Sequence, residues 1–353
     1  MYDEIIFSQP GLPVFQNKVY PTRAAAQAAV CGDVELVQCR LSGLVFNRKF
    51  NPGLLDYDAD YQNEQACSPA FKQHLDEVLE IILRHFGLQA SGVEIGCGKG
   101  YFFDMLDKAG ASVIGFDPAY EGNNPRVVRQ YFGKDALSVA PDYVVLRHVL
   151  EHIPSPWAFL EQIAAQCKAG TKIYIEVPCF DWIVSNQAFY DVFYEHVNYF
   201  TRDVLAGAFG SVIASGHFFG GQYLYLVADL SSFRKPVAYQ GKRFAEICMD
   251  AYFASLLRRR RAGGGKSYIW GAGAKGITFA NLLARQGVDV DAMVDINPAK
   301  QGRFAGGTGL PILSPDEIAG RFNDADVFVM NPVYLDEIKA SLNEFNVNVI
   351  SVA

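Results

Sequence analysis

Short apolar runs alternate with amphipathic stretches of roughly a dozen residues through most of this chain, as in βαβ units. Strand-like runs cover residues 92–96, 112–117, 142–146, 172–177 and 266–270. Strands separated by helices in this way form parallel sheets. Glycine-rich loops follow two of the runs, at residues 96–100 and 271–276. The pattern therefore predicts an α/β fold with two Rossmann-like domains.

The chain before residue 71 has a different pattern. Turn residues and aromatic residues dominate it, and helical periodicity first appears over residues 71–85. A helical stretch over residues 244–261 ends in four arginines and is followed by glycines, which is ordinary chemistry for the end of a helix. We therefore expect a small irregular or β-rich N-terminal module (1–70), a cofactor-binding domain (71–235) and a C-terminal domain (236–353).

Composition narrows the range of partners and compartments. The 353 residues include 31 Lys and Arg against 38 Asp and Glu, a net charge of −7 that disfavours nucleic acid and anionic membrane as partners. The 7 cysteines form no CxxC pair, and no apolar run approaches the ~18 residues of a membrane span. The start of the sequence also lacks the basic residues of a secretory signal. We expect a cytoplasmic protein that is a monomer or a homodimer.

The first glycine-rich loop has the features of a cofactor site. Gly96, Gly98 and Gly100 allow a sharp turn and a close approach of a ligand to a helix that starts near Tyr101. The next strand ends at Asp117, where a carboxylate can bind ribose hydroxyls. A site with so few basic groups suits a cationic cofactor such as S-adenosylmethionine better than a pyrophosphate. The expected cofactor-binding residues here are Glu94, Gly96, Cys97, Gly98, Gly100, Asp117 and Pro118.

The next elements strengthen this interpretation. The strand at 142–146 leads into the turn RHVLEHIP (147–154), and a helix and the strand at 172–177 follow. In this order and spacing the chain resembles a class I S-adenosylmethionine-dependent methyltransferase. The resemblance places Arg147 and His148 at the cofactor and His152 facing the site. The alternative is that both histidines only cap or pack the turn.

An aromatic segment at residues 179–200 contains the adjacent pair Glu195 and His196. So many aromatic residues usually indicate a core, but histidine next to a carboxylate can relay protons. Together with residues 219–222, this segment resembles the C-methyltransferases that act on nucleotide-linked keto-deoxysugars. Further motifs of that family stand at residues 12–17, 57–65, 271–276, 294–302 and 331–338.

This second resemblance implies a mechanism that needs no metal. His196 would deprotonate the carbon next to a ketone, with Glu195 close by, and the resulting carbanion would attack the methyl group of the cofactor. The other catalytic residues implied are His152, Tyr194, Tyr57 and Tyr61. Residues implied to hold the nucleotide-sugar substrate are Gly221, Gln222, Gly273 and Lys275.

Two positions depart from the family. Of its zinc-binding cysteines only Cys39 is present, with Ser42 in place of its partner, so we expect no zinc. Phe193 stands where the family often has a catalytic tyrosine, and Tyr194 is the candidate to replace that hydroxyl.

Three other functions remain open from the sequence. Phe193 is easier to reconcile with an O-methyltransferase that acts on a polysaccharide or natural-product hydroxyl, since that reaction needs a base but no enolate stabiliser. A relative without catalytic activity could bind the cofactor as a partner subunit. Gly271, Gly273, Gly276 and Asp295 fit a dinucleotide fingerprint and would suit an NAD-dependent oxidoreductase.

Overall fold

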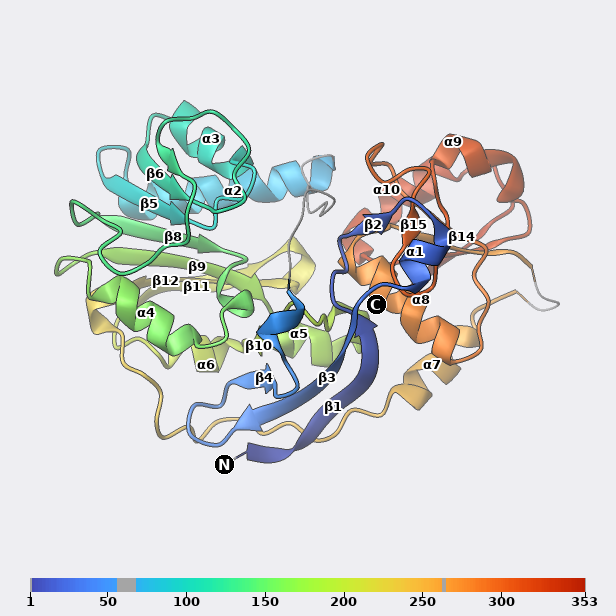
Figure 1. The fold of residues 1–353 in the computed structure, drawn as a ribbon, viewed down its shortest axis with the longest axis horizontal. Helices are drawn as coiled ribbons and strands as arrows, with labels where there is room; N and C mark the ends of the chain where they lie inside the picture. Colours follow the sequence, from blue (N-terminus) through green and yellow to red (C-terminus); the bar gives the residue numbers. More distant parts are fainter. Residues whose placement is uncertain (1, 56–67, 262–264, 353) are drawn as a thin grey trace.

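The computed structural model describes residues 2–55, 68–261 and 265–352, and in this part of the chain the strands form three larger sheets and one short ribbon (Figure 1). The N-terminal sheet lies below and between the two larger α/β units in this view. As the alternation of strand and helix patterns predicts, the fold is α/β with two Rossmann-like parts and a β-rich N-terminal module.

The N-terminal module contacts both larger parts through strand pairing. Its antiparallel sheet has the order β1-β3-β4-β10, in which β10 (Asn198–Tyr199) comes from the aromatic segment much later in the chain. A second short pairing joins β2 (Val19–Tyr20) to β15 (Phe304–Ala305) near the C-terminal sheet. The other elements of the module are β1 (Tyr2–Pro13), α1 (Arg23–Gln27), β3 (Cys31–Cys39), β4 (Val45–Asn47) and η1 (Pro52–Leu54).

A seven-stranded sheet forms the middle of the chain, in the order β11-β12-β9-β8-β5-β6-β7. Only β12 runs antiparallel to its neighbours in this sheet. Its strands are β5 (Ser91–Ile95), β6 (Ser112–Phe116), β7 (Val127–Val128), β8 (Tyr143–Arg147), β9 (Lys172–Pro178), β11 (Val212–Phe218) and β12 (Tyr223–Asp229). The associated helices are α2 (Pro69–Phe86), α3 (Tyr101–Lys108), η2 (Leu150–His152), α4 (Pro156–Ala164), α5 (Phe180–Ser185), η3 (Phe189–Asp191), α6 (Arg202–Ala206), η4 (Phe219–Gly221) and η5 (Leu230–Ser232).

The C-terminal sheet has five parallel strands in the order β16-β14-β13-β17-β18. These are β13 (Ser267–Trp270), β14 (Ala292–Val294), β16 (Ile312–Leu313), β17 (Asp326–Val329) and β18 (Asn348–Ser351). Its helices are α7 (Met249–Leu257), α8 (Ala274–Arg285), α9 (Pro315–Ile318), η6 (Ala319–Arg321), η7 (Pro332–Tyr334) and α10 (Leu335–Ser341).

Burial of the central strands and hydrogen bonds at the end of α7 stabilise this arrangement. The strands at the centre of the parallel sheets are almost wholly buried, and apart from Arg147 at the end of β8 and Asp326 at the start of β17 their residues are apolar. The arginine run after α7 is structural, because Arg260 and Arg261 both bind the buried carboxylate of Asp326 on β17. Within the described residues, no helix combines the length and the apolar character needed to cross a membrane.

Candidate active site

A cavity of about 590 Å³ lies where the two Rossmann-like sheets face each other. It is lined by Gly96 after β5, His148 after β8 and Gly271 after β13, so the carboxyl ends of both sheets open into it. Ligands of open α/β sheets bind at this end of the strands. The aromatic segment contributes Phe193, Glu195 and His196 to the same cavity.

Glu94 and Arg147 provide one charge of each sign at the first sheet. Burial raises the pKa of Glu94 to about 7, although Arg147 opposes the shift. One carboxylate oxygen of Glu94 (Oε2) and one nitrogen of Arg147 (Nη2) are buried without a hydrogen-bond partner among the described residues. Buried polar atoms rarely stay unpaired. An unpaired acceptor and an unpaired donor on residues that line the same cavity fit the ammonium and carboxylate groups of an amino-acid moiety.

The loop between β5 and α3 has the backbone that glycine permits. Gly96, Gly98 and Gly100 have φ values of 76°, 57° and 85°. A Cβ atom at Gly96 would lie 2.3 Å from Val149 Cγ2, whereas a Cβ at Gly98 would meet nothing within 4 Å. The loop is therefore tightly packed against Val149 at Gly96 and has free space at Gly98, where a ligand can approach it.

Asp117 supports this loop from the end of β6. Its carboxylate accepts hydrogen bonds from the backbone amides of Gly98 and Ala119, each at 2.8 Å. Cys97 lines the cavity, whereas Asp117 and Pro118 do not. The expected contact of Asp117 with ribose therefore stays a prediction, and the structure assigns its carboxylate to holding the glycine loop.

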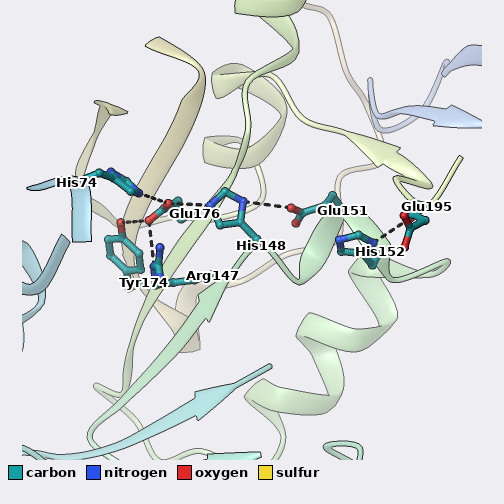
Figure 2. A network of polar contacts seen from close by, with 8 residues as sticks. All are labelled: His74, Arg147, His148, Glu151, His152, Tyr174, Glu176 and Glu195. Atoms are coloured by element: carbon teal, nitrogen blue, oxygen red, sulfur yellow. Dashed lines mark hydrogen bonds and ion pairs between the residues drawn. The ribbon is translucent and has the colours of Figure 1, made fainter. Parts of the chain in front are cut away.

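Glu176 lies at the centre of a buried polar network (Figure 2). Its carboxylate accepts from His74 Nε2 (2.8 Å), His148 Nε2 (2.9 Å), Tyr174 Oη (2.8 Å) and Arg147 Nε (3.4 Å). Burial alone would raise the pKa of Glu176, but Arg147 and the histidines hold it well below its usual range. Glu176 is thus a buried anion that orients the residues at the end of β8.

His148 connects this network to the turn that follows β8. Its Nδ1 atom lies 3.4 Å from Glu151 Oε1. Burial opposes a charge on His148, but the hydrogen bonds to Glu151 and Glu176 outweigh burial and raise its pKa to about 9. His148 therefore carries a proton at neutral pH, and it lines the cavity as a fixed cation rather than as a base.

His152 and His196 face each other further along the cavity, with ring centroids 4.8 Å apart. His152 Nδ1 donates a hydrogen bond to the backbone carbonyl of Glu195 at 2.9 Å. Burial holds the pKa of His196 well below its usual range, and the neighbouring basic side chains, among them His148 and Lys275, lower it further. His196 is therefore neutral at neutral pH and has a lone pair that can accept a proton.

The N-terminal module fixes the position of this aromatic segment. β10 pairs with β4, and the hydroxyl of Tyr199 bonds both the amide and the carbonyl of Phe193, each at 3.0 Å. Glu195 is buried, and its Oε2 accepts a hydrogen bond from the amide of Gln16 at 3.2 Å. The module thus acts as a brace that holds Glu195 and His196 against the cavity.

Several expected site residues lie elsewhere. Tyr194 is fully buried against Gly32, and its hydroxyl accepts from the amide of Asn51 at 2.8 Å, so it does not reach the cavity. The side chain of Tyr194 leaves the backbone on the opposite side from that of Phe193 and packs into the N-terminal module. Tyr57 and Tyr61 lie outside the described residues.

The expected substrate-binding residues split into two groups. Gly273 and Lys275 line the cavity, whereas Gly221 and Gln222 lie beside it. Lys275 Nζ bonds Asp191 Oδ2 at 2.8 Å and Gln222 Oε1 at 2.5 Å, so its charge is already paired. Gln222 also donates to Asn331 Oδ1 at 2.8 Å. In this structure, Lys275 and Gln222 join α8 to the segment around η3.

Other cavity residues were not anticipated. Glu151 lies in the turn at residues 147–154, but the sequence gives no sign that its side chain is buried in the cavity wall. Asn17 reaches the cavity from the N-terminal module and caps α8 by accepting from the amide of Ala274 at 3.1 Å. Only its place in the motif at residues 12–17 gave a signal for it.

Two family matches cover most of the chain. Residues 64–211 match a methyltransferase domain, and residues 237–349 match a C-methyltransferase C-terminal domain. The chain is also 25% identical over 295 residues to the C-methyltransferase NovU of Streptomyces niveus. This alignment covers 71% of this chain and 69% of that protein.

Solved structures with partial similarity include two methyltransferases. The N-methyltransferase NodS from Bradyrhizobium japonicum WM9 matches with a TM-score of 0.34 and 15% identity, over 48% of this chain and 98% of that one. The 1,6-didemethyltoxoflavin-N1-methyltransferase of Burkholderia thailandensis, solved with S-adenosylhomocysteine, matches with a TM-score of 0.34 and 15% identity. The match covers 53% of this chain and 95% of that one.

Proposed function

Because this chain is an S-adenosylmethionine-dependent methyltransferase that carries a C-methyltransferase C-terminal domain, we propose that it methylates a carbon atom of a nucleotide-linked keto-deoxysugar. The observation that carries this proposal is the position of His196. A neutral histidine lies in the cavity that both Rossmann-like sheets share, with Glu195 beside it. We further propose that the enzyme works in the cytoplasm.

The cofactor half of the cavity fits the expected cofactor. Glu94 and Arg147 would hold the ammonium and carboxylate groups of its amino-acid end through the atoms that lack partners. The open front of Gly98 leaves room for the ligand to approach the loop backbone. When bound there, S-adenosylmethionine supplies an electrophilic methyl group.

The substrate half lies toward the C-terminal sheet. Helix α8 begins at the cavity, and the N-terminus of a helix favours anions such as a pyrophosphate. Gly273 would let the phosphate groups approach this end of the helix. In this proposal the nucleotide would bind to the C-terminal domain, and the sugar would extend toward His196.

His196 would then take the proton from the carbon next to the ketone. Such a proton is acidic only when the developing enolate is stabilised, and a positioned base contributes to the rate as well. Glu195 would keep the segment in place through its bond to Gln16. Tyr57 and Tyr61, which lie outside the described residues, stay candidate catalytic residues on the resemblance alone.

One observation favours the O-methyltransferase as a second candidate. Phe193 lines the cavity 4.8 Å from the ring of His196 and has no hydroxyl to offer an enolate oxygen. Transfer to a hydroxyl needs a base but no such donor. The two functions differ in whether a carbon-bound proton is ever removed.

Solvent exchange tests the proposal directly. The protein would be incubated in deuterium oxide with S-adenosylhomocysteine and a panel of dTDP- and GDP-linked keto sugars, and each sugar analysed by NMR. We expect deuterium at the carbon next to the ketone of at least one sugar. Absence of exchange across the panel, together with methylation of a hydroxyl acceptor, would overturn carbon methylation.

Cofactor binding is expected to depend on pH through Glu94. Its carboxyl group has a pKa of about 7, so it becomes charged as the pH rises from 6 to 8, and the affinity for the cationic cofactor should rise with it. Glu94→Gln removes that charge and should weaken binding by roughly 10- to 150-fold at pH 8, since a charge-assisted bond contributes about 1.5–3 kcal/mol. Calorimetry would measure the pH dependence of the affinity and the loss of affinity in the variant.

The matched control is Glu80→Gln, at an exposed position on α2. It should bind like the unaltered protein at every pH. If Glu94→Gln kept the same pH dependence as the unaltered protein, Glu94 would not be the group responsible.

A further inference from the structure

Three side chains in the cavity wall converge on one point. Glu151, His152 and His196 each offer an atom that could bind a metal ion, and these atoms all lie within 4.8 Å of one another. All three residues line the cavity. Two imidazoles and one carboxylate are a known ligand set for divalent transition metals.

Glu151 is the most unusual member of this group. Its side chain is 1% exposed, and its Oε2 atom has no hydrogen-bond partner among the described residues. Its Oε1 atom has only the ion-pair contact of 3.4 Å with His148 Nδ1. Burying a carboxylate with unused lone pairs is costly unless another group binds them.

Each of the two histidines offers one ring nitrogen to this group. The Nδ1 hydrogen of His152 is held by the carbonyl of Glu195, which leaves the lone pair of Nε2 for another ligand. Metal-binding histidines are typically oriented by such a second hydrogen bond. The Nδ1 atom of His196 is shielded from solvent and has no hydrogen-bond partner in the described part of the chain.

A second group of similar composition provides a contrast. His74, His148 and Glu176 also lie close together, but both oxygens of Glu176 already accept hydrogen bonds. The guanidinium of Arg147 also contacts this carboxylate. The group around Glu176 is therefore a closed network, whereas the group around Glu151 is open.

We propose that Glu151, His152 and His196 bind a divalent transition-metal ion, for which Zn²⁺ and Co²⁺ are suitable probes. The ion would satisfy the unpaired atoms of Glu151 and His196 and would keep open positions on its cavity side. This goes beyond the metal-free mechanism expected from the sequence.

The ion and the proposed base would compete for one side chain. A lone pair of His196 bound to a metal cannot accept a proton from the sugar. This part of the inference rests on the proposed function, and it makes the metal-loaded protein an inhibited form for carbon methylation. We therefore expect Zn²⁺ to suppress turnover and a chelator to restore it.

Binding is tested without any activity measurement. The full chain, treated with a chelator and dialysed, would be titrated with Zn²⁺ by calorimetry and with Co²⁺ by absorption. We expect one equivalent to bind and the affinity to fall at least tenfold in Glu151→Gln and in His152→Gln. Near-ultraviolet circular dichroism would show that each variant is folded, and His196→Asn serves as an additional variant.

The control is His217→Ala, which removes an exposed histidine on β11 outside the cavity. It should bind the ions like the unaltered protein. Unchanged affinity in the folded Glu151 and His152 variants would overturn the metal site. If the ion binds as expected but raises turnover, the metal site stands and the assignment of His196 as the base is overturned.

Discussion

Replacing His196 by glutamine is expected to lower kcat by roughly 10²- to 10⁴-fold, the range lost when a general base is removed. Glutamine is similar in size but has no basic nitrogen. Because burial keeps His196 neutral, its lone pair is available at neutral pH in the unaltered enzyme. The affinity for S-adenosylmethionine should stay nearly unchanged, since the proposed cofactor contacts are made by Glu94 and the glycine loop, which line another part of the cavity. Steady-state kinetics and calorimetry would measure the two effects separately.

His217→Gln is the matched control, because it makes the same change at an exposed histidine. Its kcat should equal that of the unaltered enzyme. A His196→Gln variant that keeps normal turnover would remove His196 as the base, and one that loses cofactor binding to the same extent as turnover would indicate a structural role instead.

Replacing Glu176 by alanine is expected to cost about 3–5 kcal/mol in the free energy of unfolding, because it leaves buried charges without their partner. Arg147 and the protonated His148 both depend on this carboxylate, and Tyr174 and His74 lose a hydrogen bond as well. The midpoint of thermal or urea unfolding would measure this loss of stability.

The loss of stability at low pH should also differ between Glu176→Ala and the unaltered protein. The folded-state pKa of Glu176 is lowered, so its contribution to stability is present above its unfolded pKa and is lost as the pH falls through the folded value. The alanine variant should therefore lose less stability on acidification than the unaltered protein. Glu80→Ala, at an exposed position, should change stability by less than about 0.5 kcal/mol. Equal unfolding midpoints for the Glu176 and Glu80 variants would contradict the network.

Local patterns predicted the elements that hold the site. The apolar run at 92–96 is β5, the glycines after it turn the chain, and the helix starts at Tyr101 as expected. These features depend on residues close together in sequence, whose spacing is visible without a structure. For the N-terminal module, the turn residues and the lack of helical periodicity left an irregular or a β-rich structure open, and the module is β-rich.

Contacts between distant segments could not be predicted in this way. The pairing of β10 with β4 decides that Tyr194 packs inward while His196 faces the cavity, and neither residue's sequence neighbours contain that information. The bond between Lys275 and Asp191 likewise joins residues from different parts of the fold. For the same reason, Glu151 could be seen in the turn but its burial beside two histidines could not.

The atom that receives the methyl group tests the central claim most directly. The enzyme would be supplied with S-adenosylmethionine labelled with ¹³C in its methyl group and with a nucleotide-linked keto sugar, and the product would be examined by ¹³C NMR. The account predicts a labelled methyl group bonded to a sugar carbon next to the ketone. A labelled methoxy group on a sugar oxygen would contradict it.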